Sequence, residues 1–379
     1  MTVDRIGSIT KALVVGGGIG GMAAAISLAE RGVAVELIDI DPEWRVYGAG
    51  ITITGPTLRA YKQLGLLEAI KAEGAITSKI RLFEYDGTHL LDLDEPAIEE
   101  GLPATGGIMR PVLHRIMQMR VRELDIEVRL GLSVTAIKTS EDFSDVTFTD
   151  GQSRTYDLVI GADSVFSSVR NLVFPHMGPA RPTGQGCWRI SIRKPPELET
   201  GEFFLGHASP CGITACAPDK VYMWMLTPHI DRDEHMSDEE LFVTLKSLLA
   251  DFGGNAGWIR DNMTPGDWIN YRPLSAALQP KDWYHGRVVL LGDAVHATTP
   301  HLASGAGMAV ESGIVLAEEL ARTNNVTSAL RAYQERRYER CRDVIETSVA
   351  VGKLQLQHGD PKVHAELLGA ALHRLNAPF

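Results

Sequence analysis

The hydrophobic residues near the N-terminus form two short continuous runs, separated by a segment rich in alanine and leucine. Residues 11–15 and 33–39 are apolar runs of strand length, and residues 22–31 lie between them. Continuous apolar runs of this length are typical of strands buried on both faces, while an Ala- and Leu-rich segment favours a helix. The pattern therefore predicts a strand–helix–strand unit whose two strands lie parallel.

The middle of the chain follows a different pattern, because hydrophobic and polar residues tend to alternate from Gly184 to Tyr271. Alternation with a period of two is typical of strands that bury one face. We expect one antiparallel sheet with a nearby helix at residues 237–252 and with strands at residues 79–93, 187–192, 202–207, 213–217 and 221–227. After Arg322 the spacing is helical again, at residues 333–351 and in a last helix that ends at Arg374.

Composition and charge argue against several classes of protein. The 379 residues are 44% hydrophobic and 22% charged, as in an ordinary globular protein, and the formal net charge is −11. A negative balance argues against nucleic acid as a partner, because its phosphates call for a basic surface. The uncharged stretch at residues 12–29 contains bunched glycines, which suit a turn better than a continuous membrane helix, so no membrane span is expected.

The four cysteines form no regular framework, which makes a reducing, cytoplasmic location the expectation. Cys211 and Cys216 are close in sequence, but their odd spacing on a strand would place them on opposite faces. We therefore expect no redox pair. No group of His and Cys residues has the spacing of a metal site, so no metal is expected either.

A glycine-rich turn joins the first strand to the helix, and Gly16, Gly18 and Gly21 satisfy the pattern G-x-G-x-x-G. In this setting the first glycine permits a tight turn, and the second lets the main chain approach a diphosphate. The third allows the helix to pack closely on the strand. Asp39 ends the second strand, where its carboxylate can accept hydrogen bonds from ribose hydroxyls. These residues predict a dinucleotide site but do not distinguish FAD from NAD.

Two later motifs carry further chemistry. The first is an apolar strand that leads to Asp163. The second, at residues 283–308, is typical of a buried strand followed by a turn at Asp293, a loop stiffened by Pro300 and the start of a helix at residues 305–322. The carboxylate of Asp293 can bind a hydroxyl group, and the N-terminus of the helix favours negative charge nearby.

Together these motifs resemble those of the FAD-dependent aromatic hydroxylases with the p-hydroxybenzoate hydroxylase fold, most closely the short salicylate, urate and hydroxynicotinate hydroxylase-like members. The resemblance covers about residues 11–320, although Ser164 stands where the family usually has glycine and Ala303-Ser304-Gly305 where it has G-Q-G. It implies an α/β fold with three parts: a Rossmann-like FAD-binding domain (residues 1–77, 104–178 and 274–345), an inserted, mostly antiparallel β-sheet substrate domain (78–103 and 179–273) and a C-terminal helical segment (346–379).

The resemblance also implies a role for each motif in binding FAD. Asp163 would support the diphosphate region, Asp293 would bind a ribityl hydroxyl, and Gly307 would keep side-chain bulk away from the flavin ring. Arg110 would contact a phosphate or ribose, which suits the forked guanidinium group. The residues expected to bind FAD are Gly16, Gly18, Ile19, Gly21, Asp39, Arg45, Ala49, Arg110, Val134, Asp163, Gly292, Asp293, Gly305, Ala306 and Gly307.

The antiparallel sheet offers an aromatic pocket with a few polar anchors, as small-molecule sites commonly have. The residues expected to bind substrate are Arg189, His207, Tyr222, Trp224 and Tyr271. Among them, the resemblance to urate-type members singles out Tyr222 as a substrate-contacting and catalytic residue. Pro300 matches the proline whose carbonyl lies near the transferred oxygen, whereas His296 matches a structural histidine.

The activity implied by the resemblance is hydroxylation of a small aromatic or N-heteroaromatic substrate with O2, through a flavin C4a-hydroperoxide. No second G-x-G-x-x-G follows, so NADH or NADPH is expected to visit transiently. Two alternatives stay open: a flavin oxidoreductase without oxygen insertion, and a flavin-binding relative that only stabilises a reactive intermediate for a partner enzyme. The protein is expected to be a monomer or homodimer.

Overall fold

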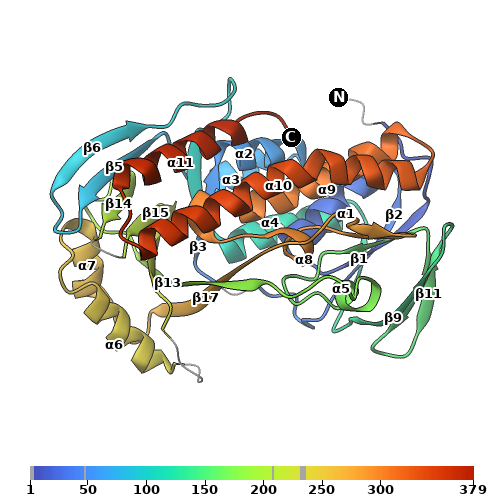
Figure 1. The fold of residues 1–379 in the computed structure, drawn as a ribbon, viewed down its shortest axis with the longest axis horizontal. Coiled ribbons are helices and arrows are strands. Elements are labelled where there is room, and N and C mark those ends of the chain that lie inside the picture. Colours follow the sequence, from blue (N-terminus) through green and yellow to red (C-terminus); the bar gives the residue numbers. More distant parts are fainter. Residues whose placement is uncertain (1–3, 47, 207–208, 231–235) are drawn as a thin grey trace.

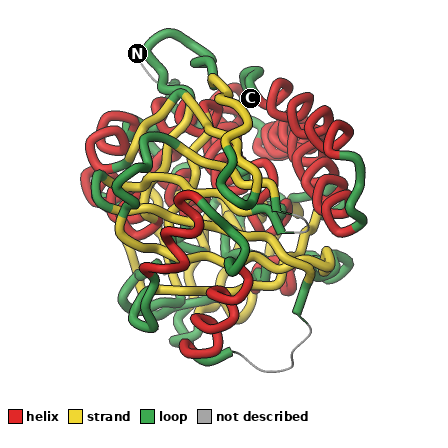
Figure 2. The backbone as a smooth tube through the Cα atoms, turned by 90° about the vertical axis from the view of Figure 1, so that its left-hand side faces the viewer, coloured by secondary structure: helices red, strands yellow, loops and turns green. Residues whose placement is uncertain are grey.

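The computed structural model describes residues 4–46, 48–206, 209–230 and 236–379. A parallel sheet and a larger antiparallel sheet follow one another along the long axis of the molecule. The helix α10 (Val326–Leu356) runs across both, and α11 (Pro361–Leu375) lies beside it at the end of the antiparallel sheet (Figure 1). Seen from the side, these two helices lie together at one edge of the molecule, next to the strands (Figure 2).

The predicted strand–helix–strand unit is present as β1 (Lys11–Val15), α1 (Ile19–Ala29) and β2 (Ala34–Asp39). It belongs to a six-stranded sheet of order β18-β19-β12-β1-β2-β8, in which only the edge strand β18 is antiparallel to its neighbour. The other strands are β8 (Glu127–Leu130), β12 (Leu158–Gly161), β18 (Tyr284–His285) and β19 (Val288–Leu290). The central strands are buried on both faces, which explains their uninterrupted hydrophobic sequences.

Helices cover this sheet at close range. α9 (Gly305–Arg322) packs on α1 so closely that a Cβ at Gly313 would lie only 2.6 Å from the main-chain nitrogen of Ala24. α4 (Arg110–Glu123) also packs on α1, and α2 (Gly55–Gln63) packs on α9. Gly313 of α9 therefore serves the close packing of these two helices.

The antiparallel sheet has seven strands in the order β17-β13-β16-β15-β14-β5-β6, with one parallel pair, β14 and β5. Its strands are β5 (Lys79–Glu84), β6 (His89–Asp94), β13 (Arg181–Arg193), β14 (Gly201–Leu205), β15 (Cys211–Ala217), β16 (Lys220–Pro228) and β17 (Trp268–Leu278). Alternate residues face opposite sides, as the period-two pattern requires. One side packs apolar residues with α6 (Asp238–Leu248) and α7 (Gly254–Asn262), and the other side faces the rest of the molecule.

Two small sheets complete the strand structure, with orders β3-β7-β4 and β11-β10-β9. The former packs on β15 of the antiparallel sheet and leads directly into α2 and α4. The remaining elements are β3 (Gly50–Thr54), α3 (Leu67–Glu73), β4 (Ala75–Thr77), β7 (Thr105–Met109), β9 (Val134–Thr139), β10 (Ser144–Phe148), β11 (Ser153–Tyr156), α5 (Ser168–Val173), α8 (Asp293–His296) and η1 (Pro300–Leu302).

The C-terminal helices are fastened to the rest of the chain by arginines. The buried carboxylate of Glu311 in α9 pairs with Arg337 at 2.7 Å and with Arg340 at 2.8 Å, both from α10. Burial alone would raise the pKa of Glu311, but these two guanidinium groups lower it. These charges are paired where water is excluded. Removing one partner would therefore lower the free energy of unfolding far more than the loss of a surface ion pair would.

The structure confirms the predicted α/β fold class, with its parallel sheet, inserted antiparallel sheet and C-terminal helices. The helix predicted at residues 305–322 has those bounds, while α10 is longer than predicted at both ends. The strands predicted in the middle region appear as β13 to β16, but β17 runs across the domain boundary at residue 273, so the domain division stays a prediction.

Two further findings concern the described residues. None of the helices among them is long and apolar enough to cross a membrane, and no group of three His, Cys, Asp or Glu residues among them could hold a metal ion. All four cysteines are free and buried. Cys211 packs on the side of α6 and α7 while Cys216 packs with Tyr222, so the two lie on opposite faces of the sheet as their spacing predicts.

Candidate functional site

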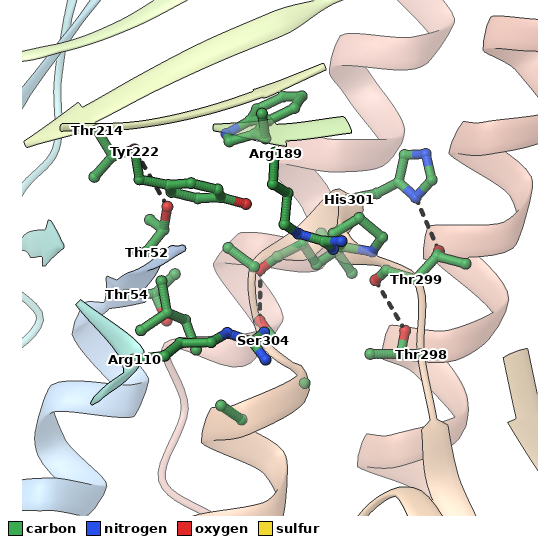
Figure 3. A pocket seen from close by; sticks show the side chains of 18 of the residues that line it. Thr52, Thr54, Arg110, Arg189, Thr214, Tyr222, Thr298, Thr299, His301 and Ser304 are labelled. Atoms are coloured by element: carbon green, nitrogen blue, oxygen red, sulfur yellow. Dashed lines mark hydrogen bonds between the residues drawn. The ribbon is translucent and has the colours of Figure 1, made fainter. Parts of the chain in front are cut away.

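A cavity of about 570 Å³ lies where the two large sheets meet. The glycine-rich turn, the start of α4, the Gly292-Asp293 turn and the start of α9 line one part, which we call the cofactor end. The antiparallel sheet, η1 and the last two helices line the other part, which we call the substrate end. Segments far apart in the sequence therefore meet around one space (Figure 3).

The three glycines of the G-x-G-x-x-G pattern are needed for different structural reasons. Gly16 has a φ of +107°, which favours glycine, and a Cβ at Gly21 would collide with the carbonyl oxygen of Gly16. A Cβ at Gly18 would instead meet nothing within 4 Å, because that position opens onto the cavity. Gly16 and Gly21 are thus required by the fold, and Gly18 leaves room for a ligand.

The N-terminus of α1 begins at this opening. Gly18 is its N-cap and no side chain caps the helix, so its first main-chain N–H groups are available to a ligand. The carboxylate of Asp39 accepts hydrogen bonds from the N–H groups of Gly17 at 2.7 Å and of Asp41 at 2.8 Å. Asp39 does not line the cavity, and these bonds show that it holds the shape of the turn. Its contact with a ribose stays a prediction.

The second helix N-terminus at the cavity belongs to α9. Ser304 directs its hydroxyl to the carbonyl of Leu302 at 2.6 Å and does not cap the helix. Gly305 and Ala306, in the first turn, line the cavity. Because the positive end of the helix dipole lies there, this position favours a ligand with negative charge.

Two charged side chains complete the cofactor end. The carboxylate of Asp293 is exposed to the cavity but surrounded by protein on its other sides, and this burial raises its pKa, against the effect of Arg110. Burial lowers the pKa of Arg110, and so does the nearby guanidinium of Arg189. Two cations that face one cavity favour an anionic ligand.

These features fit FAD. A diphosphate needs N–H donors and a cation, which the uncapped turn at Gly18 and Arg110 provide, and a polyol needs an acceptor such as Asp293. A Cβ at Gly18 would extend into the open space that such a diphosphate needs. Ile19 and Gly292 also line this part of the cavity.

Other residues expected to bind FAD lie outside the cavity lining. Asp163 accepts hydrogen bonds from the hydroxyl of Ser167 at 2.5 Å and from the N–H of Ser168 at 2.7 Å, so it fastens the start of α5. Arg45 is about half exposed and pairs with Glu43 at 2.8 Å. Val134 is buried in the hydrophobic core. The structure gives each a local role, and their contact with FAD stays a prediction.

Ala49 and Gly307 also have packing roles. Ala49 is buried with Cys216 beside Tyr222, so it supports the position of that tyrosine. A Cβ at Gly307 would collide with the side chain of Thr57 in α2, and Gly307 does not line the cavity. The glycine is therefore needed for the contact between α9 and α2, and its role beside a flavin ring stays a prediction.

The substrate end begins with three side chains on one face of the antiparallel sheet. Arg189 of β13 pairs with Trp224 of β16, and Tyr222 lies two residues before Trp224. The hydroxyl of Tyr222 points toward the guanidinium of Arg189, and Arg110 extends into the same space from the opposite side (Figure 3). Burial raises the pKa of Tyr222 to about 12, so its hydroxyl keeps its proton at neutral pH and can donate a hydrogen bond.

The prediction for Tyr271 requires correction, because this residue faces the other side of the sheet. Its ring lies 4.7 Å from that of Trp188, and its hydroxyl accepts a hydrogen bond from the N–H of Ile230 at 2.9 Å. Trp188 and Tyr271 are paired neighbours on the face that packs with α6 and α7, and Tyr271 does not line the cavity. His207, also expected to bind substrate, lies outside the described residues.

Pro300 lines the cavity at the start of η1, next to a chain of hydrogen bonds. Nδ1 of His301 lies 2.8 Å from the hydroxyl of Thr299, and its Nε2 lies 3.2 Å from the amide oxygen of Gln355 in α10. Gln355 in turn lies 3.1 Å from Nε2 of His364 in α11. Burial lowers the pKa of His301 to about 4, so the imidazole in this series of hydrogen bonds is neutral.

The last two helices contribute residues that sequence reasoning missed. We call them the C-terminal wall: Val351, Gln355, His364, Leu368 and Leu372. The signal that could have found them is their spacing of four, since residues four apart lie on one face of a helix. The spacing shows a common face, but only the folded chain shows what that face meets.

His296 is close to the cavity but inside the protein. It is 1% exposed, its Nε2 lies 3.0 Å from the hydroxyl of Ser312, and burial lowers its pKa to about 3. These contacts join α8 to α9, in agreement with the structural role expected for it.

Comparison with known proteins agrees with this geometry. A family described as "FAD binding domain" matches residues 9–348. The chain is 30% identical to YetM of Bacillus subtilis, whose name describes an FAD-dependent monooxygenase, over 94% of this chain and 96% of YetM. It is 31% identical to 2-heptyl-3-hydroxy-4(1H)-quinolone synthase of Pseudomonas aeruginosa, over 90% and 88% of the two chains.

Among solved structures, HpxO of Klebsiella pneumoniae complexed with FAD and uric acid matches 97% of this chain and 92% of its own, with a TM-score of 0.81 and 23% identity. That likeness concerns the fold, and the family match and the relatives carry the assignment. The chain therefore belongs to the family of this FAD binding domain and is an FAD-dependent monooxygenase of the aromatic hydroxylase type.

Proposed function

We propose that the protein hydroxylates a small aromatic or N-heteroaromatic ring, with FAD, O2 and either NADH or NADPH. The observation that carries the proposal is one continuous cavity, which joins the uncapped N-termini of α1 and α9 to the Arg189, Tyr222 and Trp224 face of the sheet. A cofactor at one end and a ring at the other would then lie within reach of each other.

The chain would hold FAD mainly with its main chain. The turn at Gly18 and Ile19 would bind the diphosphate, with Arg110 as the neighbouring cation, and Asp293 would accept hydrogen bonds from the ribityl chain. The first turn of α9 would favour negative charge on the flavin ring. When bound, the cofactor would supply electrons from the nicotinamide and an activated oxygen atom from O2.

At the substrate end, the side chains would bind and orient the ring. Trp224 offers an aromatic surface, the hydroxyl of Tyr222 can donate to a ring oxygen, and the charge of Arg189 favours a ring hydroxyl in its deprotonated form. A deprotonated hydroxyl makes the ring carbons more electron-rich, which assists attack on oxygen. We place Pro300 beside the position of the transferred oxygen, and its loop, together with the C-terminal wall, would exclude water.

Aromatic substrates are tested with the purified, FAD-loaded enzyme. Phenols, benzoates and hydroxypyridines are screened for substrate-stimulated oxidation of NADH or NADPH, O2 uptake and the mass of the product under ¹⁸O2. The proposal expects one ¹⁸O atom in the product. Oxidation of NAD(P)H without O2 uptake would instead support an oxidoreductase without oxygen insertion, and tight FAD binding without turnover would support a protein that only stabilises an intermediate.

A further inference from the structure

Aliphatic side chains line the cavity from two directions. Leu226 and Leu274 line it from the antiparallel sheet, where they pack with Cys187 and Trp224. Val351, Leu368 and Leu372 line it from the last two helices. The packing of α10 on β13 and β17 and of α11 on η1 brings these two groups to the same cavity.

Each helix presents these residues at a regular spacing. His364, Leu368 and Leu372 are four apart, so they form one stripe on α11. Leu368 and Leu372 are partly buried, whereas Leu367 on the adjacent face is 37% exposed. The helix therefore has two apolar surfaces. Leu368 and Leu372 face the cavity, and Leu367 faces the solvent.

The position of α11 is fixed at both ends. At its start, His364 lies 3.1 Å from Gln355, which connects it to His301 beside Pro300. At and beyond its end, three arginines donate hydrogen bonds to main-chain carbonyls: Arg340 to Leu375 at 2.9 Å, Arg59 to Asn376 at 2.8 Å and Arg336 to Phe379 at 2.9 Å. The wall is therefore already in place before a ligand enters, which lowers the entropic cost of binding.

The charged groups of the substrate end lie beside the leucines of the sheet, since Arg189 pairs with Trp224, which packs with Leu226 and Leu274. Arg189 and Tyr222 belong to the middle strands of the sheet, and Arg110 reaches them from α4 (Figure 3). A compact polar ring would satisfy these groups but would leave the aliphatic side chains facing water. Apolar side chains gain from a ligand that removes them from water.

We propose that the part of the cavity lined by Leu226, Leu274, Leu368 and Leu372, which we call the aliphatic arm, binds an alkyl chain carried by the ring substrate. This inference rests on the proposed function and specifies its substrate class: aromatic rings with a polar oxygen substituent and an aliphatic chain. Leu368 and Leu372 then determine how long a chain the enzyme accepts.

The test uses the FAD-loaded enzyme and two homologous series, 4-alkylphenols and 2-alkyl-4-hydroxyquinolines, with chains from methyl to nonyl. Both the dissociation constant, by calorimetry, and kcat/KM are measured. The affinity is expected to rise by up to about fourfold for each methylene group until the arm is filled, as the transfer free energy of a methylene predicts. A dissociation constant independent of chain length in both series overturns the inference.

Substitutions on α11 locate the arm. Leu368→Trp fills the space and is expected to move the best chain length to a shorter one, whereas Leu367→Trp, on the exposed face of the same helix, leaves it unchanged. Both variants should bind FAD as the parent does, which checks that they fold. Equal chain-length profiles for the two variants overturn the inference.

The failure of this inference differs from a failure of the proposed function. Hydroxylation of the methyl compounds with no gain from longer chains would sink the aliphatic arm alone. Chain-length-dependent binding without incorporation of oxygen into any member of either series would keep the arm and sink the hydroxylase proposal.

Discussion

The two ends of the cavity are built from different parts of the polypeptide. At the cofactor end the main chain provides most of the surface, through the turn at Gly18 and the first turn of α9. At the substrate end the surface consists of side chains such as Arg189, Trp224 and Leu368. A main-chain site depends on local backbone geometry, so substitutions there affect folding or cofactor binding, whereas side chains of the sheet can change with little effect on the fold. The following predictions separate these two cases.

The largest effect is expected from Gly21→Ala at the cofactor end. The new Cβ would collide with the carbonyl oxygen of Gly16, main-chain atoms that cannot move without opening the turn. We expect the free energy of unfolding to fall by about 3 kcal/mol, the upper range for overpacking, in denaturant titrations of the apoprotein. Gly18→Ala is the matched control, since its Cβ meets nothing within 4 Å. It should keep the stability of the parent and weaken FAD binding, and equal stabilities for the two variants would contradict the different roles of these glycines.

A smaller effect, confined to the substrate, is expected from Arg189→Ala. Loss of a hydrogen bond to a charged group costs about 2 kcal/mol, which corresponds to a KM for a phenolic substrate roughly 30-fold higher. The dissociation constant of FAD should be unchanged. Arg193→Ala serves as the control, because Arg193 lies on the same strand but donates to Asn262 at 2.7 Å at the surface. A weaker affinity for FAD in Arg189→Ala would place this arginine at the cofactor end instead.

Two tyrosines on opposite faces of one sheet give a sharper comparison. Tyr222→Phe removes a hydroxyl that faces the cavity, and we expect kcat/KM to fall about tenfold, as for the loss of one good hydrogen bond. Tyr271→Phe removes the acceptor for the N–H of Ile230 and should lower the free energy of unfolding by about 1 kcal/mol without changing KM. Steady-state kinetics and denaturation of both variants test whether Tyr222→Phe affects catalysis and Tyr271→Phe affects stability. A raised KM in Tyr271→Phe would show that Tyr271 contacts the substrate after all.

The smallest effect concerns pH and the link between η1 and α10. The pKa of His301 is lowered to about 4 by burial, so the folded protein favours the neutral imidazole. Below the unfolded value of about 6.5, unfolding takes up a proton, so stability decreases as the pH falls toward 4. From pH 7 to pH 6 this residue should contribute a loss of about 0.7 kcal/mol. In His301→Gln the unfolding free energy should therefore vary less steeply with pH than in the parent. Identical slopes would mean that His301 is accessible to protons in the folded protein.

Much of the fold could be predicted from local sequence, because the physical requirements involved are local. The tight turn at Gly16 needs a positive φ, and the strand Lys11–Val15 must be apolar throughout because both faces are buried. The α9 helix was predicted with its observed bounds, since its apolar sequence begins with Gly305 directly after the loop that starts at Pro300. At the cofactor end the same locality predicted the turns at Gly18 and Asp293, which line the cavity, whereas Asp39 and Asp163 lie outside its lining.

What the sequence alone determined is therefore the N-terminal strand–helix–strand unit, the strands β13 to β16 and the helix α9, together with the main-chain turns of the cofactor end. The tertiary structure decided which face of the sheet meets the cavity, so Tyr222 lines it while Tyr271 packs behind the sheet. It also decided that Leu368 and Leu372 of the last helix line the same cavity as Leu226 of β16 and Leu274 of β17, residues far away in sequence. Periodicity shows that side chains share a face, but the partner of that face depends on long-range packing, which no local pattern contains.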